Sequence, residues 1–326
     1  MAAGTLLTSA QRLAWLRLIR TDGIGPQTFR QMINREGSAE AALAALPALT
    51  RRIGLAPAIP SLAEAEDELA GLERLGGRLI LSSDPDYPPL LQFIHAPPPV
   101  LSAIGGAGLD LRRAVAIVGA RNASTAGQKM TRILADDLGR AGYVVVSGLA
   151  RGIDAAAHRA SLGTGTVAVY AGGLDRTYPS ENLALAQEIV ASGGMLISEM
   201  PFGWEPRARD FPRRNRIVAG LSLLAVVVEA ARRSGSLITA RLALEQDREV
   251  FAVPGSPLDP RAEGGNHLIQ QGAHLITGAA DILETLRHAS PPRPSLLEPG
   301  LDLLDITADR DISGDDLDRL LGVLSV

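Results

Sequence analysis

The chain of 326 residues contains no cysteine, so neither a disulfide nor thiolate chemistry contributes to its stability or function. It also lacks long apolar runs. The best candidate, from Ile217 to Val228, is 12 residues long and includes Gly220 and Ser222, whereas a membrane helix needs roughly 18 or more. The amino terminus lacks the basic start and apolar stretch of a secretory signal. These absences predict a cytoplasmic protein with no membrane segment.

Two common phosphate-binding motifs are also missing. Neither G-x-G-x-x-G nor G-x-x-x-x-G-K-[ST] occurs, which argues against the usual NAD-binding and ATP-hydrolysing proteins. The five histidines have no metal-ligand spacing among themselves, and no cysteine can assist them. We therefore expect no metal and no cofactor; the expectation of no catalytic residues rests on the family resemblance given below.

Lysine is nearly absent as well, because Lys129 is the only one and almost all cations are arginine. The formal net charge is −4, but residues 301–326 hold seven Asp and two Arg, so the preceding residues sum to about +1. The densest basic cluster lies within residues 201–220 and comprises Arg207, Arg209, Arg213, Arg214 and Arg216. This distribution favours a focused anion site over nonspecific binding of polyanions.

From Arg113 onward, short apolar runs alternate with helical segments. Continuous runs without alternation are typical of strands buried on both faces, with helices supplying parallel crossovers. We therefore predict an α/β fold with a doubly wound, mainly parallel sheet. The predicted strands are Ala114–Val118, Tyr143–Val146, Val167–Tyr170, Met195–Ile197, Leu223–Val228, Glu249–Val253 and His274–Ile276.

The remaining chain is predicted to form smaller units around this sheet. Residues 9–50 and 61–76 indicate helices, and the turn Asp22–Pro26 resembles the hairpin of helix-hairpin-helix modules, whose amides hold a phosphate. A plain helix connector is the alternative. A proline-rich stretch at 87–99 separates this region from the sheet. We predict a helical domain at 1–78, a sheet domain at 79–289, a proline-rich linker at 290–300 and a short acidic segment at 301–326.

In an open parallel sheet, ligands bind outside the carboxyl ends of the strands. The loops there combine glycine, small hydroxyl residues and arginine, which together describe a phosphate-binding rim. Strand-to-helix turns also need Gly and Ser as caps, so each loop alone has a structural alternative. The loops are 119–125, 147–154, 171–173, 198–199 with the arginine segment, and 229–239.

Two further groups of residues have alternative interpretations. Phe211 stands beside paired cations, an arrangement in which a nucleic-acid base can stack on the ring while the arginines bind the phosphate of that nucleotide. The alternative is that Phe211 belongs to the core and that the arginines form a solvated helix face. Asp154 and His158 lie four residues apart and can meet on one helix face. We favour a structural or loop-anchoring pair over a catalytic base.

Taken in series, these motifs resemble the DNA-processing protein A family, also called DprA or Smf. The resemblance covers about residues 80–285. The strings that carry it are Ile117–Arg121, Ser147–His158, Gly172–Pro179, Phe211–Ser222, Val228–Ala230, Ser234–Ala240 and Val253–Gly255.

The resemblance implies a non-catalytic protein with an extended Rossmann-like domain. Such a protein binds and protects single-stranded DNA and loads the RecA recombinase on it during natural transformation and homologous recombination. It also implies a homodimer formed through about residues 250–285. The DNA-binding residues it implies here are Gly119, Arg121, Ser147, Gly148, Arg151, Gly152, Phe211, Arg213, Arg214, Asn215, Arg216, Gly235, Ser236 and Thr239.

The chain departs from the family pattern in two places. Ala120 stands where the first motif usually has serine, which removes one hydroxyl from the implied pocket. Many members end in a winged-helix-like module, of which residues 301–326 would contain at most the first half. The amino-terminal helices resemble the SAM-like or helix-hairpin-helix-like domain of many members.

Two other functions fit parts of the sequence. A nucleotide-binding enzyme related to phosphoribohydrolases and lysine-decarboxylase-like proteins would use Asp154, Glu199 or Glu229 as acid or base. The chain lacks the Pro-Gly-Gly-x-Gly-Thr signature of that group. An oligomeric scaffold that binds an acidic protein through its arginines fits the composition but leaves the glycine-rich loops unexplained.

Overall fold

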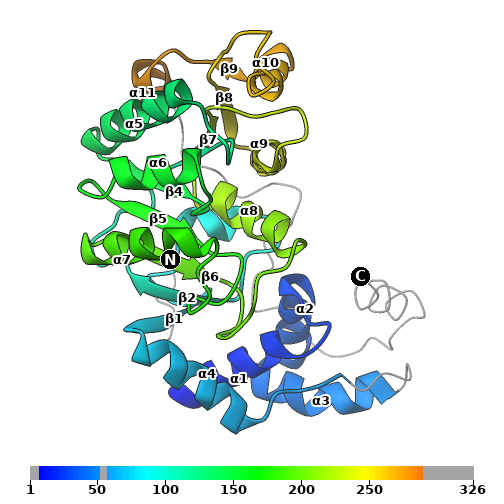
Figure 1. Cartoon of the computed structure of the whole chain (residues 1–326). Helices are drawn as coiled ribbons and strands as arrows, with labels where there is room; N and C mark the ends of the chain where they lie inside the picture. The colour runs from blue at the N-terminus through cyan, green and yellow to red at the C-terminus, as the bar shows by residue number, and fades with distance from the viewer. Residues whose placement is uncertain (1–6, 52–56, 289–326) are drawn as a thin grey trace.

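The computed structural model describes residues 7–51 and 57–288, so the predicted linker at 290–300 and the acidic segment at 301–326 lie outside the described residues. An amino-terminal group of helices leads into an α/β part built on one nine-stranded sheet (Figure 1). The predicted fold class is therefore confirmed. No helix within the described ranges has both the length and the apolar character needed to cross a membrane.

The amino-terminal helices form where the sequence places caps. Thr8 and Gln11 form a capping box at the start of the first helix, and Ser61 and Glu64 form another at the fourth. The helices α1, α2 and α3 share a small core of their own that includes Leu18, Phe29 and Leu46. The helices are α1 (Ser9–Arg20), α2 (Pro26–Glu36), α3 (Ala39–Arg51) and α4 (Leu62–Arg74).

The turn between α1 and α2 has the predicted geometry. Gly23 adopts a φ of 76°, which is open mainly to glycine, and Gly25 precedes Pro26 at the start of α2. The amide of Ile24 donates to the carbonyl of Thr21, which closes the turn.

The sheet has the strand order β1-β2-β6-β5-β4-β3-β7-β8-β9. In this spatial order, all adjacent strands between β6 and β9 are parallel to one another. β2 is antiparallel to both of its neighbours, β1 and β6. The strands are β1 (Gly77–Leu81), β2 (Val100–Gly105), β3 (Ala114–Val118), β4 (Val144–Ser147), β5 (Thr166–Val169), β6 (Met195–Ser198), β7 (Leu224–Val227), β8 (Glu249–Ala252) and β9 (His274–Leu275).

Each predicted apolar run corresponds to a strand, but β1 and β2 were not predicted. β1 begins directly after α4, and β2 begins directly after Pro99, where prolines indicate a linker rather than a strand. The proline-rich stretch therefore lies between two strands of one sheet and contains the short helix η1 (Pro89–Phe93). The prediction that this stretch separates the helical region from the sheet was wrong.

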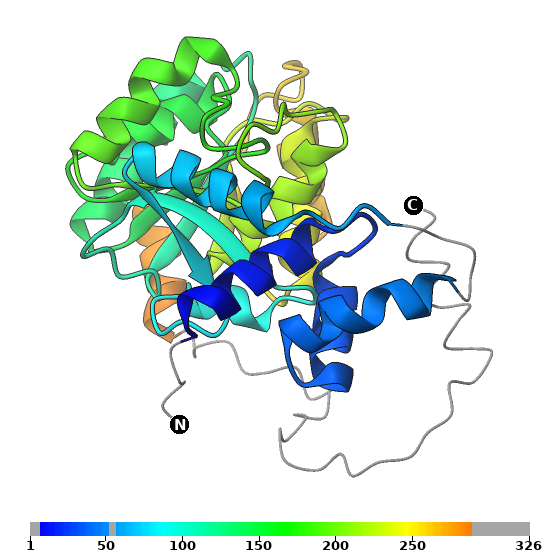
Figure 2. The ribbon, with the colours of Figure 1, turned by 90° about the horizontal axis from the view of Figure 1, so that it is seen from below.

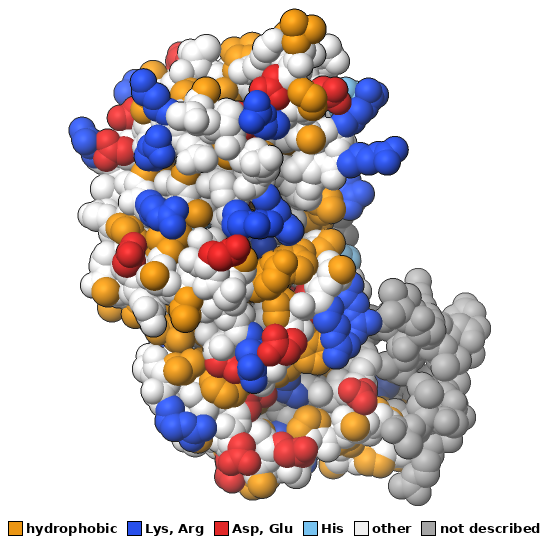
Figure 3. All heavy atoms as spheres, viewed as in Figure 1, with side chains coloured by type: hydrophobic (Ala, Val, Ile, Leu, Met, Phe, Trp, Pro, Cys, Tyr) orange, Lys and Arg blue, Asp and Glu red, His pale blue; other side chains and the backbone are white. Residues whose placement is uncertain are grey.

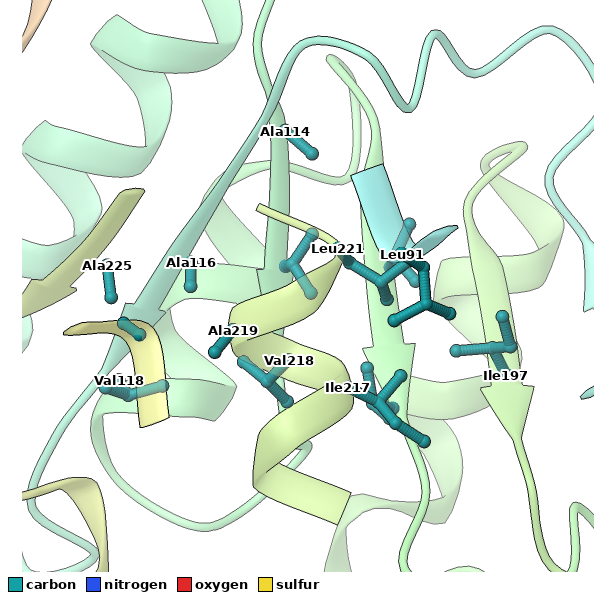
Figure 4. Packing of buried hydrophobic residues seen from close by; sticks show 14 of the residues in the cluster. Leu91, Ala114, Ala116, Val118, Ile197, Ile217, Val218, Ala219, Leu221 and Ala225 are labelled. Atoms are coloured by element: carbon teal, nitrogen blue, oxygen red, sulfur yellow. The ribbon is translucent and has the colours of Figure 1, made fainter. Parts of the chain in front are cut away.

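Helices cover both faces of the sheet. One face packs against α8 (Asp210–Gly220) and α9 (Gly235–Glu245), and Figure 4 shows Ile217, Val218 and Ala219 of α8 beside strand residues. The other face packs against α5 (Thr125–Arg140), α6 (Ile153–Ala160), α7 (Leu183–Ala191) and α11 (Ala279–His288). The remaining helices are η2 (Ser180–Asn182) and α10 (Glu263–Gln270).

The helical part and the sheet share a core. Leu16 of α1 and Leu72 of α4 belong to the same buried cluster as Ala168 and Leu196 of the sheet. Seen from below, α1 and α4 lie against the end of the sheet that carries β1 and β2 (Figure 2). The contact is also polar, since Arg20 of α1 pairs with Glu68 of α4 and donates to the carbonyl of Glu199 after β6.

Candidate functional site

A pocket lies at the carboxyl ends of β3, β4 and β5, where α8 begins. The pocket is open to solvent and its cavity volume is about 20 Å³. Figure 3 shows blue and orange side chains next to each other in the middle of this face, beside α8. The pocket is lined by Arg121, Gly148, Ala150, Arg151, Tyr178, Pro179, Phe211 and Arg214. It therefore combines cations with aromatic rings at the edge where the sequence predicted a site.

The crevice between β3 and β7, where the strand order reverses, is filled by a side chain. Glu229, directly after β7, accepts hydrogen bonds from the amide and hydroxyl of Ser124 at 2.9 and 2.5 Å. A Cβ atom added to Gly127 would lie 2.6 Å from both carboxylate oxygens of Glu229, so the first turn of α5 is packed against it. Ligands usually bind at such a reversal. Here the open pocket is displaced toward β4 and β5.

The glycine-rich loop after β4 is held together from within. Asp154 accepts hydrogen bonds from the amides of Gly148 and Ala150 at 3.1 and 3.3 Å. Gly152 has a φ of 73°, and a Cβ atom there would lie 2.6 Å from the carbonyl oxygen of Arg121. The amides that we expected to donate to a phosphate are therefore partly used by Asp154. The glycine at 152 allows two loops to approach each other.

Arg214 forms the floor of the pocket and is 93% buried, with a relative exposure of 7%. Its guanidinium lies against the backbone of Gly148, and its Nε atom has no hydrogen-bond partner among the described residues. Burial lowers the pKa of Arg214 to about 10, so the group stays charged at neutral pH. Burial also raises the pKa of Asp154, an effect that the nearby Arg214 opposes. A charged, largely buried guanidinium at the floor of a pocket fits an anionic ligand.

Phe211 lies between two other residues of the pocket wall. The guanidinium of Arg121 lies over its ring, 5.4 Å from the centroid, and the ring of Tyr178 is 5.3 Å away, tilted by 59°. Phe211 is half-buried at the pocket, so its interpretation as a core residue is not supported. Arg121 is exposed, and its guanidinium has no ion pair in the part of the chain that the structure describes. It is therefore available to a phosphate.

The other arginines of α8 point away from this pocket. Arg213 and Arg216 both pair with the buried carboxylate of Glu199, and Arg216 also donates to the carbonyl of Ala96 at 2.6 Å. Asn215 donates to the carbonyl of Gly235 at 3.3 Å and so connects α8 to α9. Neither arginine lines the pocket. The structure thus separates Arg214 from the neighbours with which the sequence grouped it.

The remaining predicted residues support the loops. Ser147 donates to the carbonyl of Ile117 at 2.7 Å, and a Cβ atom on Gly119 would lie 2.6 Å from Ile153. At the start of α9 the hydroxyl of Ser234 accepts from the amide of Ser236, while Thr239 is buried one turn later. None of these residues, nor Gly235, lines the pocket.

Asp154 and His158 do not bond to each other. The Asp154 carboxylate turns toward the loop after β4, whereas His158 Nδ1 lies 2.8 Å from the hydroxyl of Thr166. Each residue thus has a structural partner of its own, so the structural pair that we favoured does not form. The three acid or base candidates, Asp154, Glu199 and Glu229, are all engaged in such contacts. Within residues 7–51 and 57–288, no cluster of acidic and histidine residues suited to a metal occurs.

Sequence reasoning missed Ala150, Tyr178 and Pro179 as pocket residues. Tyr178 and Pro179 lie between β5 and η2, several residues beyond the Ala171–Gly173 turn that we examined. Inspecting only the residues directly after each strand cannot find them. The adjacent aromatic and proline in the Gly172–Pro179 string were the available signal.

Comparison with known proteins gives consistent matches in two regions. Residues 78–287 match the model of a family described as DNA recombination-mediator protein A, and residues 9–71 match a DprA-like N-terminal HHH domain. The DNA processing protein DprA of Bacillus subtilis (strain 168) is 47% identical over 221 residues, which are 67% of this chain and 74% of that protein. Protein Smf of Escherichia coli (strain K12) is 43% identical over 234 residues, or 70% of this chain and 63% of that protein.

Solved structures give the same result. The X-ray structure of DNA processing protein A from Streptococcus pneumoniae aligns with a TM-score of 0.63 at 41% identity, covering 69% of this chain and 78% of that one. A structure of DNA processing protein A from Helicobacter pylori, described in terms of its single-stranded DNA binding mode, aligns with a TM-score of 0.59 at 29% identity. It covers 65% of this chain and 96% of that one.

Proposed function

This chain belongs to the DNA recombination-mediator protein A family, and from that premise we propose that it binds single-stranded DNA, without catalysis, in the pocket beside α8. The observation that carries the proposal is Arg214. Its buried, charged guanidinium lies at the floor of an open pocket whose mouth carries Arg121 and Arg151. Such a site suits one phosphate of a chain, with a base against the aromatic wall.

The contacts of the acidic residues support a binding function over an enzymatic one. Asp154, Glu199 and Glu229 each satisfy loop amides, arginines or a helix start. Such contacts stabilise the loops around the pocket. A general acid or base must instead reach a substrate atom within hydrogen-bond distance.

The test is fluorescence anisotropy of a labelled oligo-dT titrated with the protein at several salt concentrations, with duplex DNA as competitor. We expect salt-sensitive binding that duplex does not displace. Arg121→Ala should weaken it and reduce the slope of log affinity against log salt by about 0.7, the value for one lost phosphate contact on a single strand.

Arg140→Ala is the matched control. Arg140 is exposed in the last turn of α5, whereas Arg121 lies in the loop that precedes α5, so the control removes the same charge at the far end of that helix. Unchanged affinity and slope in Arg121→Ala, or equal losses in both variants, would contradict the assignment of the pocket.

We also propose that the protein forms a homodimer through residues 250–285. Leu258 is 93% exposed and Leu275 of the edge strand β9 is 52% exposed, so apolar surface and an open sheet edge occur in the same region. Leu258→Glu should lower the mass measured by analytical ultracentrifugation, whereas Leu62→Glu, at an exposed leucine of α4, should not. A monomeric wild-type protein would contradict this proposal.

The proposed cellular activity is loading of RecA on single-stranded DNA in the cytoplasm, during natural transformation and homologous recombination. The family description as a recombination mediator supports it. The test is DNA-dependent ATP hydrolysis by RecA on strands first coated with single-strand-binding protein. This chain should shorten the lag before ATP hydrolysis by RecA begins, and the Arg121→Ala variant should shorten that lag less.

A further inference from the structure

We propose that Tyr178 forms a second surface of the pocket, on which one base of the bound strand stacks, and that Phe211 fixes the ring from behind. This inference rests on the proposed binding of single-stranded DNA. It assigns the exposed contact with the base to Tyr178 rather than to Phe211.

Tyr178 is accessible in a way that most aromatic residues of this fold are not. It is 51% exposed and lines the pocket, whereas Tyr87 and Phe251 are almost completely buried. The residue before it is anchored, because the hydroxyl of Thr177 lies 3.1 Å from that of the buried Tyr170. An exposed apolar side chain is ordinary by itself. An exposed ring fixed at the mouth of a cationic pocket is the arrangement that a stacking ligand needs.

Phe211 is less available to a base. The Arg121 guanidinium lies over its ring, and the ring of Tyr178 packs against it at a tilted angle. These contacts give Phe211 a supporting position, since it holds a cation and an aromatic ring in fixed places. A base that approaches from solvent meets Tyr178 before it meets Phe211.

The charges around Tyr178 complement this assignment. Arg121, Arg151 and Arg214 line the same pocket, so a base on Tyr178 would have its own phosphate within reach of a guanidinium. Every base has a flat face, so this contact would not select among sequences. Bases inside a duplex are already stacked and paired, so the contact would select single strands.

The experiment measures the affinities of Tyr178→Ala, Tyr178→Phe and Arg121→Ala for two labelled oligomers of equal length and charge, oligo-dT and an abasic strand. Tyr178→Ala should lose about 5- to 150-fold in affinity for oligo-dT, the effect of one stacked base, and little for the abasic strand. Tyr178→Phe should keep the wild-type affinity. Arg121→Ala should weaken binding to both oligomers.

Phe93→Ala serves as the matched control, because Phe93 is a partly exposed aromatic residue of η1 that does not line the pocket. A second readout uses Tyr178→Trp. Its added fluorescence, after subtraction of the Trp15 and Trp204 signal of the wild type, should be quenched by oligo-dT but not by the abasic strand. Circular dichroism melting curves confirm that each variant is folded.

The outcomes separate the two proposals. If Arg121→Ala weakens binding while Tyr178→Ala binds oligo-dT like the wild type, the stacking surface is wrong and the pocket stands. If Tyr178→Ala lowered the affinity for both oligomers equally, the ring would support the pocket without contacting a base. If the wild type binds neither oligomer, the proposed function fails and the stacking surface fails with it.

Discussion

The guanidinium of Arg214 occupies the space that a side chain on Gly148 would need. Glycine at 148 and arginine at 214 thus form one unit, although one lies in the loop after β4 and the other in α8. Without the glycine, the buried cation could not lie against the backbone at the pocket floor.

Gly148→Ala is therefore expected to displace Arg214 and to weaken binding of oligo-dT at least tenfold, because the floor of the pocket loses its cation. Anisotropy titration measures this effect, and thermal melting shows whether the fold persists. Gly163→Ala is the control, since nothing lies within 4 Å of a Cβ atom placed there. Wild-type affinity in Gly148→Ala would show that Arg214 does not contribute to binding.

Arg216→Ala should act mainly on stability. Arg216 is the more buried of the two cations that pair with Glu199, and its loss should cost up to about 3 kcal/mol, the value for breaking a buried pair. Arg213 pairs with the same carboxylate but is largely exposed, so Arg213→Ala should cost less than about 1 kcal/mol. Urea denaturation of both variants measures the difference. Equal losses of unfolding free energy in the two variants would mean that Arg216 contributes no more than Arg213 to stabilising Glu199.

His158 should make the fold sensitive to acid. The hydroxyl of Thr166 donates to the carbonyl of Val145, so it accepts the proton of His158 Nδ1, and the buried Nε2 atom carries none. Burial lowers the pKa of His158 from 6.5 to about 3. The folded state therefore binds fewer protons than the unfolded state, and stability falls as the pH drops from about 6.5 toward 3.

His158→Asn tests this contribution, because the amide nitrogen can replace Nδ1 as donor to Thr166 but cannot titrate. The free energy of unfolding, measured from pH 8 to pH 4, should fall less steeply in the variant below pH 6.5. The difference in slope has an upper limit of about 1.4 kcal/mol per pH unit for one proton. Parallel curves for both proteins would contradict the prediction.

Arg20 should connect the amino-terminal helices to the sheet. It pairs with Glu68 at 2.9 Å, both side chains are largely buried, and it donates to the carbonyl of Glu199. Arg20→Met alone should cost about 3 kcal/mol, because Glu68 keeps a charge without a partner. Arg20→Met with Glu68→Leu should recover much of that loss in urea denaturation. If the double variant lost as much unfolding free energy as the two single variants together, Arg20 and Glu68 would not act as a buried pair.

The sequence predicted the sheet well because strands buried on both faces are continuous apolar runs, as Ala114–Val118 shows. It missed β1 and β2, since neighbouring helix and proline patterns obscured them. The site was predicted less completely. Arg121, Gly148, Arg151, Phe211 and Arg214 do line one pocket.

The differences between the predicted and the observed grouping of residues have two physical origins. Residues on a helix point in directions set by its period, so Phe211 and Arg214 share a face while Arg213 does not. That separation was predictable from the helix alone. Asp154 accepts from amides only four and six residues away, but its carboxylate can turn toward them only in the folded loop, and Glu229 enters the crevice by bonding Ser124, which is 105 residues away. Only the folded structure brings these together.

The cluster that joins Leu16 and Leu72 to Ala168 and Leu196 has a consequence for how the protein is made. Leu79 and Val100 of the same cluster follow α4 closely and can cover part of the apolar faces of α1 and α4 early in synthesis. The cover is complete only once Ala168 and Leu196 have been added, and until then aggregation competes with folding. The separate small core of α1, α2 and α3 can form at once, so it would keep part of the nascent chain compact meanwhile.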